Sequence, residues 1–213
     1  MTTISTPLTT NIAAPSPYAT DLNQALHFSI RENHPVFYRV YYNKEGDKQP
    51  LGCGFGSSRF SDPQRPPRFA TIYLAVDFET AFAETIVRRS RIGNPGVVRE
   101  EQELNYWQVT RVTVKERLRV LALTDGDLVL AGLHPDITGA DPHTPGQHLA
   151  GMAFDDERLD GVCYHSYLTH LACLAVFDRA RHKLQATPHE AIMLPPWRRE
   201  TLKLLKSYHV GLV

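Results

Sequence analysis

The sequence lacks a net charge and a long apolar run. Lys+Arg and Asp+Glu each total 23, so no broad positive field is available to attract nucleic acid or an anionic membrane. No apolar stretch approaches the roughly 20 residues that span a bilayer. We therefore expect binding to neither nucleic acid nor membrane, although a small cluster of arginines would suffice for a phosphate-bearing ligand.

Basic residues are missing from the start of the chain, and cysteines are few. The first basic residue is Arg31, so the N-terminus has neither the charged start of a secretory signal nor the arginines of a transit peptide. The three cysteines, Cys53, Cys163 and Cys173, form no Cys-x-x-Cys pair, and we expect them to be reduced and mostly buried. Both observations favour the cytoplasm.

A known metal-ligand spacing is also missing, although the chain contains ten histidines. The strongest candidates lie in a loop rich in Pro, Gly and His, between positions 133 and 151: His134, Asp136, Asp141, His143 and His148. Pro and Gly separate them, and no spacing matches a zinc site. We therefore predict no metal, and we interpret the segment as a polar loop with the potential to act as a lid.

What is present has the composition of one globular domain. The chain has 213 residues, of which 42% are hydrophobic, and this is enough to fill a single core. Residues 1–20 are rich in Thr, Ala, Ser and Pro and have no hydrophobic periodicity, which is typical of a flexible arm. We predict an N-terminal arm over residues 1–20 and one domain over residues 21–213.

Hydrophobic patterning predicts more strands than helices. Runs of β-branched and aromatic residues indicate strands over residues 36–42, 70–76, 106–114, 118–123, 162–164 and 171–177. Helical spacing indicates helices over residues 21–28, 78–91, 147–158 and 196–209, the second of them capped by Asp77. A Gly- and Pro-rich connection covers residues 49–68. Since no regular β-α-β alternation occurs, we expect an α/β domain of the α+β type rather than a doubly wound sheet.

Five short motifs combine residues that carry chemistry. They are Phe37-Tyr38-Arg39 and Ile72-Tyr73-Leu74-Ala75 in predicted strands, Gly56-Ser57-Ser58-Arg59-Phe60 in the long loop, Glu84 in the helix after Asp77, and Tyr164-His165-Ser166 at a strand end. Each is common alone. Their order and spacing over residues 37–178 resemble the RES domain family, named for its Arg, Glu and Ser, which here would be Arg39, Glu84 and Ser166. Many members have Trp where this chain has Phe60.

The resemblance implies a fold, an activity and partners. The fold would be that of the ADP-ribosyltransferases, in which small split β-sheets flanked by helices surround a cleft for NAD. The activity would be that of a toxin that degrades NAD⁺, with NAD as substrate rather than cofactor and with water or inorganic phosphate as acceptor. The resemblance also implies a homodimer and a helix-turn-helix antitoxin of the Xre type that covers the cleft.

The residue types suit this chemistry. The guanidinium groups of Arg39 and Arg59 can grip a pyrophosphate through paired charge-assisted hydrogen bonds, and Tyr73 can stack on the cationic nicotinamide ring. Glu84 can accept a hydrogen bond from the ribose 2′-hydroxyl that strengthens in an oxocarbenium-like transition state. Because nicotinamide leaves as a neutral molecule, one carboxylate is enough. Ser166 can hold the ribose or the carboxamide. The predicted catalytic residues are Arg39, Tyr73 and Glu84, and the predicted NAD ligands are Arg39, Arg59, Tyr73 and Ser166.

Each of these residues also has a purely structural interpretation. Glu84 would form an ion pair with Arg88 four residues on, which stabilises a helix by about 0.2–0.5 kcal/mol. The other interpretations are cross-strand packing for Tyr73, an exposed edge-strand charge for Arg39, a solvated loop cation for Arg59 and a turn cap for Ser166.

Two other functions fit the same residues. Transfer of ADP-ribose to a protein target would use the same ribose contacts. A module without turnover would keep the cleft and bind a nucleotide or a partner peptide in it.

Overall fold

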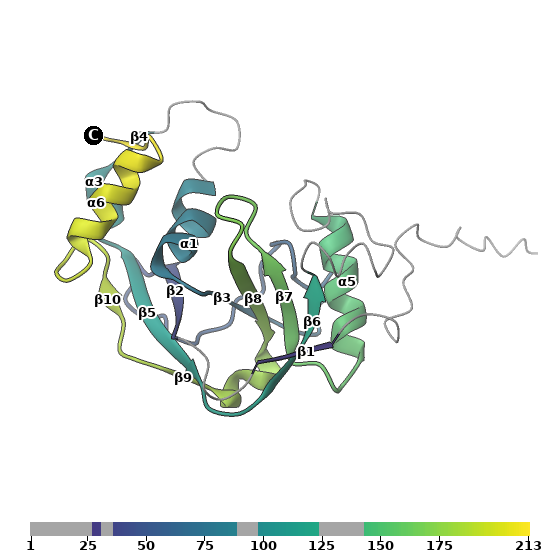
Figure 1. Ribbon diagram of the computed structural model, residues 1–213. Helices are drawn as coiled ribbons and strands as arrows, with labels where there is room; N and C mark the ends of the chain where they lie inside the picture. Colours follow the sequence, from purple (N-terminus) through teal and green to yellow (C-terminus); the bar gives the residue numbers. More distant parts are fainter. Residues whose placement is uncertain (1–26, 31–35, 89–97, 124–142) are drawn as a thin grey trace, which may run out of the picture.

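A curled mixed sheet forms the centre of the molecule, as the computed structural model of residues 27–30, 36–88, 98–123 and 143–213 shows (Figure 1). Nine strands join in the order β1-β6-β7-β8-β3-β2-β5-β10, and β9 pairs with β5. Within this sheet β6 and β7 run parallel, and the other neighbours run antiparallel. The strands are β1 (His27–Ile30), β2 (Phe37–Tyr42), β3 (Thr71–Ala75), β5 (Trp107–Val114), β6 (Leu118–Leu123), β7 (Gly161–His165), β8 (Ala172–Phe177), β9 (Leu184–Ala186) and β10 (Glu190–Ala191).

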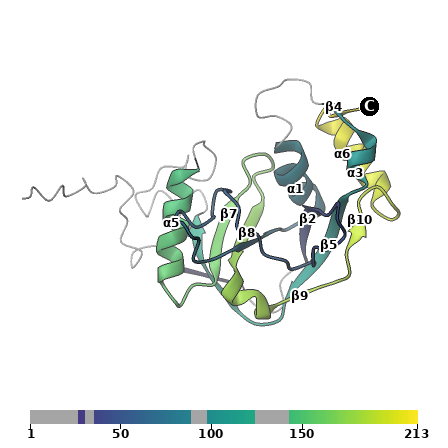
Figure 2. The same ribbon diagram turned by 180° about the vertical axis from the view of Figure 1, so that it is seen from behind.

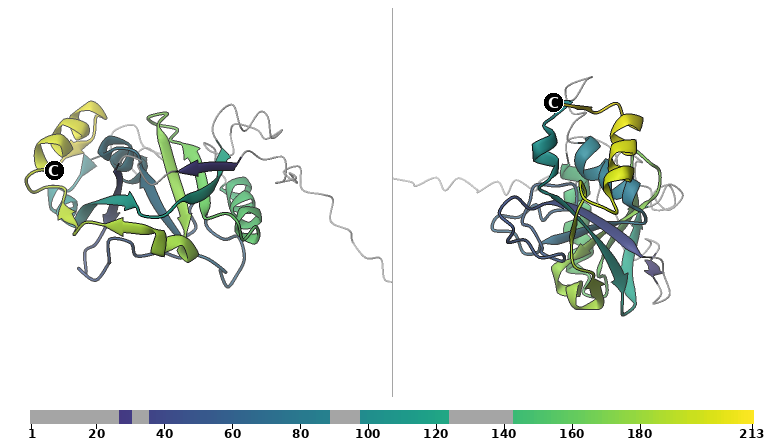
Figure 3. Two further views of the ribbon diagram at one scale, coloured as in Figure 1. Left: turned by 60° about the horizontal axis from the view of Figure 1, so that its bottom comes forward. Right: turned by 90° about the vertical axis from the view of Figure 1, so that its left-hand side faces the viewer.

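The helices lie at both ends of the sheet and over its middle (Figures 1 and 2). Helix α1 packs against β2 and β3, whereas α5 packs against β7. Helices α5 and α6 lie at opposite ends of the molecule (Figure 1 and the left panel of Figure 3). The helical elements are α1 (Phe78–Phe82), the π-helical turn η1 (Ala83–Val87) that continues it, α3 (Glu101–Leu104), α5 (Thr144–Asp155), the 3₁₀ helix η3 (Asp178–Lys183) and α6 (Arg198–Ser207). A small parallel pair joins β4 (Val98–Arg99) to β11 (Gly211–Leu212).

The sheet is nearly divided between β2 and β3. These two strands share one register pair, Tyr38 with Ala75, whereas β2 pairs with β5 at six positions and β3 pairs with β8 at five. The nine strands therefore form two well-paired halves that are joined at one point. The expected split sheets are present in this form, as one hydrogen-bonded sheet with a minimal junction, and the expected α/β class is confirmed.

Both faces of the central strands are buried, which explains their continuous apolar sequences. Along β3, Ile72 and Leu74 point into one apolar cluster, while Ala75 belongs to the cluster on the opposite face. The larger cluster also receives Phe82 of α1 and Leu149 of α5. Because the two clusters clamp β3 from both sides, the strand that carries Tyr73 has a fixed register and direction.

The strands predicted from hydrophobic patterning are all found, and no strand end differs from its predicted position by more than one residue. The helix predicted over residues 78–91 is confirmed through Arg88, and Asp77 caps it by accepting a hydrogen bond from the Thr80 amide at 2.7 Å. Helix α5 begins three residues before its predicted start, with Pro in its first turn.

One predicted helix is wrong in the part that the structure describes. The helix expected over residues 21–28 extends into His27 and Phe28, which instead belong to strand β1. This strand pairs with β6, so pairing at a sheet edge prevails over local helical patterning. The predicted arm over residues 1–20 and most of the histidine-rich loop lie outside the described residues. Among the residues described, no helix is long and apolar enough to cross a membrane.

Gly161 gives a test of how tightly the sheet is packed. A Cβ atom at this position in β7 would lie 2.3 Å from the Ala175 carbonyl oxygen and 2.9 Å from Val176 Cα. Both contacts are with backbone atoms, so we expect Gly161→Ala to lower the free energy of unfolding by about 1–3 kcal/mol in urea titrations. Gly54 has open space around its Cβ position, so Gly54→Ala is the matched control. Equal stability of the two variants would contradict this packing.

Candidate functional site

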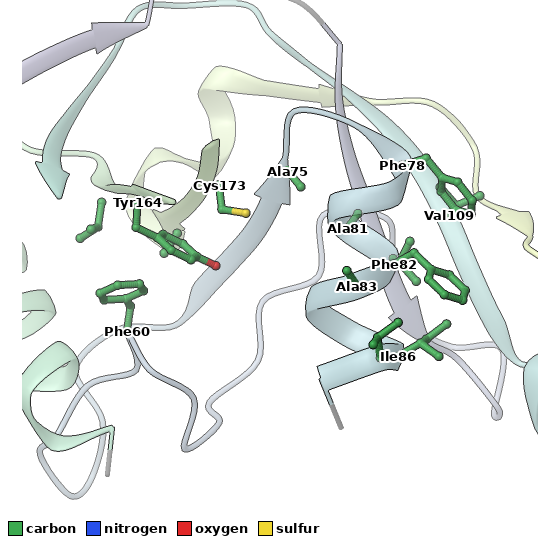
Figure 4. Packing of buried hydrophobic residues seen from close by; sticks show 14 of the residues in the cluster. Phe60, Ala75, Phe78, Ala81, Phe82, Ala83, Ile86, Val109, Tyr164 and Cys173 are labelled. Atoms are coloured by element: carbon green, nitrogen blue, oxygen red, sulfur yellow. The ribbon is translucent and has the colours of Figure 1, made fainter. Parts of the chain in front are cut away.

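A cavity of about 930 Å³ opens at the junction of β2 and β3. Its walls come from these two strands, from the loop over residues 47–59 that connects them, from helix α1 with η1, and from β7 and the start of α5. Small side chains help to keep the space open: Ala75 and Ala81 line it between the Phe60–Tyr164 pair and the α1 core (Figure 4). The volume lies within the range of small-molecule and cofactor sites.

Arg39 reaches the cavity from the middle of β2. Its two terminal nitrogens donate hydrogen bonds to the carbonyl oxygens of Pro50 and Gly52, at 2.9 and 2.7 Å, and its guanidinium lies 5.0 Å from the centre of the Tyr41 ring. Burial lowers the pKa of Arg39 from its ordinary value, although a guanidinium stays protonated at neutral pH. Arg39 thus braces the long loop and also places a poorly solvated positive charge in the cavity wall.

Tyr73 is fixed through its hydroxyl group. The hydroxyl accepts a hydrogen bond from the Phe60 amide at 3.0 Å and shares another with the Ser58 hydroxyl, also at 3.0 Å. Burial raises the pKa of the Tyr73 phenol, so the group stays neutral. Because the loop holds the hydroxyl, the ring lies in the cavity wall with a defined orientation.

The loop that holds Tyr73 is itself anchored at its far end. Asp62 is 1% exposed and accepts hydrogen bonds from the amide and the side chain of Arg68. Burial by itself would raise the pKa of Asp62, but the Arg68 contacts outweigh it, so the pKa lies below its ordinary value. The charged pair closes the end of the loop that contains Phe60.

Glu84 enters the cavity from a π-helical turn. One carboxylate oxygen accepts a hydrogen bond from the Ser166 hydroxyl at 2.6 Å, and the other accepts one from Arg88 at 3.3 Å. Such wide helical turns occur often at functional sites. Ser166 is 1% exposed and also accepts hydrogen bonds from the Leu168 and Thr169 amides. Ser166 therefore closes a turn and, from outside the cavity lining, orients the Glu84 carboxylate.

Arg59 and Arg88 lie at the Glu84 end of the cavity. Arg59 is 4% exposed, and its pKa is lowered first by burial and next by the nearby charge of Arg88. Glu84 acts in the opposite direction on that pKa. Two guanidinium groups therefore share this end with one carboxylate, which favours an anionic ligand.

The cavity is positive even though the chain is neutral overall. Its lining has more cationic than anionic side chains, namely Arg39, Lys48, Arg59, Arg88 and Arg181 against Asp47 and Glu84. This excess of three positive charges is local, since the whole chain carries equal numbers of both signs. A ligand with a negatively charged centre fits such a lining.

The structure brings the predicted residues together around this cavity. Arg39, Arg59, Tyr73 and Glu84 all line it, and Ser166 reaches it through its hydrogen bond to Glu84. The Glu84–Arg88 ion pair, proposed as a purely structural alternative, is present as well. Glu84 therefore both pairs with Arg88 and lines the cavity.

Sequence reasoning missed the places of Arg88, His143, Tyr164 and Arg181 in the lining. Two sequence signals could have indicated these residues. Arg88 lies four residues after Glu84, and Tyr164 lies two residues before Ser166. His143 had been grouped with possible metal ligands, but no group of three or more such side chains that could hold a metal is found within the described ranges.

Comparisons with known proteins bear on the family and the fold. A sequence model of the RES domain matches residues 35–199. The chain is similar in fold to a chain in the crystal structure of the M. tuberculosis MbcT–MbcA toxin–antitoxin complex, with a TM-score of 0.61 and 20% sequence identity over 84% of this chain and 91% of that one. No curated protein matches the sequence.

The anchoring of Tyr73 predicts a cost when its hydroxyl is removed. Tyr73→Phe leaves the Phe60 amide without its partner and removes one hydrogen bond from the Ser58 hydroxyl, which keeps its contact with Ser61. We therefore expect the free energy of unfolding to fall by about 1–2 kcal/mol. Tyr167 is 71% exposed, and Tyr167→Phe is the matched control that should leave stability unchanged. Urea unfolding of both variants measures the difference, and a Tyr73→Phe protein as stable as wild type would show that the loop does not depend on this hydroxyl.

Proposed function

Because the chain belongs to the RES domain family, we propose that it is a toxin-like enzyme that cleaves NAD⁺ at the bond between nicotinamide and ribose. Water or inorganic phosphate would accept the ADP-ribosyl group, and turnover would deplete cellular NAD. One observation carries the proposal: Arg39, Arg59, Tyr73 and Glu84 line a single cavity of about 930 Å³.

The charge and size of the cavity support a dinucleotide as the ligand. NAD⁺ carries two negative charges on its pyrophosphate and one positive charge on nicotinamide, so a lining with an excess of cations matches the pyrophosphate. Guanidinium groups bind phosphate oxygens in paired hydrogen bonds. Arg59 and Arg88 lie near Glu84, while Arg39 and Arg181 extend the positive lining along β2 and η3.

Glu84 is suited to the bond-breaking step. Each of its carboxylate oxygens receives one protein hydrogen bond, and a carboxylate oxygen can accept a second. The ribose 2′-hydroxyl can supply it, and that bond strengthens as positive charge develops on the ribose ring. Nicotinamide leaves as a neutral molecule, so the site needs no acid to protonate it.

Tyr73 and Ser166 would prepare the reacting groups. The Tyr73 hydroxyl is held by the loop, so its ring face is the part left for contact with the flat nicotinamide cation. Ser166 fixes the Glu84 carboxylate from outside the cavity lining. A direct contact between Ser166 and the nicotinamide ribose stays a prediction.

The fold similarity to a chain of a toxin–antitoxin complex supports a protein partner. We propose that an antitoxin of the Xre helix-turn-helix type covers the cavity, that the toxin is a homodimer, and that it acts in the cytoplasm. Covering the mouth of a single cavity would block substrate entry without any change in the site itself.

Nicotinamide release tests the proposed reaction. Purified full-length protein is incubated with NAD⁺, with and without phosphate, and the products are resolved by chromatography. We expect ADP-ribose without phosphate, or ADP-ribose 1″-phosphate only when phosphate is present. Because Glu84 is the only carboxylate proposed to act on ribose, Glu84→Gln should slow release at least about a hundred-fold, and Arg39→Ala should also abolish most of it.

Glu157 lies on the surface, so Glu157→Gln is the matched control and should behave as wild type. No release by wild type would refute NAD⁺ cleavage and leave a binding module, whereas equal release by wild type and Glu84→Gln would refute the role of Glu84. A mass increase on a protein target, with little free ADP-ribose, would instead identify ADP-ribose transfer.

A further inference from the structure

Arg88 connects Glu84 to a histidine on another part of the fold. One terminal nitrogen of Arg88 donates to Glu84 Oε2 at 3.3 Å, and the other lies 3.1 Å from His143 Nε2. Glu84 and Arg88 belong to the helix after β3, whereas His143 precedes the first residue of α5. The three side chains line the same cavity.

The chemistry of this contact fixes the state of His143. A guanidinium group can only donate hydrogen bonds, so His143 Nε2 must be the acceptor and carry no proton. The proton then resides on Nδ1, which lies 3.2 Å from the Ser57 carbonyl oxygen and can donate to it. His143 is therefore neutral, with one ring nitrogen directed at Arg88 and the other at the loop.

His143 is held on a rigid support. Gln147, one turn further along α5, donates to the carbonyl oxygens of Ser57 and Ser58 at 3.4 and 3.1 Å. Ser58 in turn shares a hydrogen bond with the Tyr73 hydroxyl. The start of α5, the loop and Tyr73 are thus linked, and His143 has little freedom to turn away from Arg88.

We infer that His143 and Arg88 are positioning residues for Glu84, an inference that rests on the proposed function. Ser166 holds Oε1 and Arg88 holds Oε2, so the carboxylate plane is fixed from two sides. A long arginine side chain loses much conformational freedom when it is held in one geometry, and the neutral acceptor on His143 supplies the second contact that keeps it there.

A neutral acceptor also suits this place better than a carboxylate would. A second acid at position 143 would compete with Glu84 for Arg88 and would cancel part of the positive excess of the lining. An imidazole accepts the hydrogen bond without adding negative charge. The arrangement therefore orients Arg88 toward Glu84 and leaves the attraction for a pyrophosphate intact.

Kinetics of position 143 variants test the inference. His143→Phe removes both ring hydrogen bonds, and we expect kcat for nicotinamide release to fall roughly ten- to a hundred-fold with KM for NAD⁺ changed less than about threefold. His143→Gln keeps an acceptor for Arg88 and a donor for Ser57, so it should recover most of kcat. His148 is exposed on α5, and His148→Phe is the control. Wild-type kcat in His143→Phe, or no recovery in His143→Gln, would overturn the inference.

A measurement without turnover separates this inference from the proposed function. In nitrogen NMR spectra at pH 7.5, His143 should show a protonated Nδ1 and an unprotonated Nε2, and Arg88→Met should shift the Nε2 signal. A protonated Nε2 in wild type would overturn the positioning role whatever the activity. A wild-type protein that shows the expected His143 state but releases no nicotinamide would instead refute the proposed function.

Discussion

The single register pair between β2 and β3 is the constraint on which the site depends. Two strands that paired along their full length would leave no room between their side chains. Here Tyr38 and Ala75 join the halves at one point, and the apolar clusters on both faces hold each half in place. The sheet can therefore remain one sheet and still hold a cavity at its centre.

The same junction explains why residues far apart in sequence meet. Arg39 comes from one half of the sheet and Tyr73 from the other, while Glu84 follows β3 on the helix that packs across both strands. The polar contacts around the cavity then form one connected set through the loop over residues 57–61 and the start of α5. A change in the loop is thus transmitted to Tyr73 on one side and to Arg88 on the other.

The sequence was sufficient to predict those helices and strands that have strong local signals. Alternation and apolar runs located the strands, and Asp77 located the start of α1. The grouping of Arg39, Arg59, Tyr73 and Glu84 followed from the resemblance of the motif order to the RES domain family. The contacts of the long loop could not be predicted, because backbone carbonyls such as those that bind Arg39 have no signature in the sequence. His143 was also out of reach, since its partner Arg88 lies 55 positions away.

The π-helical turn at Ala83–Val87 has a consequence for how this helix can vary among relatives. A π turn contains one more residue than an α turn, and each residue of an α-helix advances the chain by about 100° around the axis. Loss of one residue ahead of Glu84 would give a regular helix but would swing the carboxylate and Arg88 together away from Ser166. Within this family, insertions and deletions should therefore be tolerated in the outer loops and selected against between the Asp77 cap and Arg88.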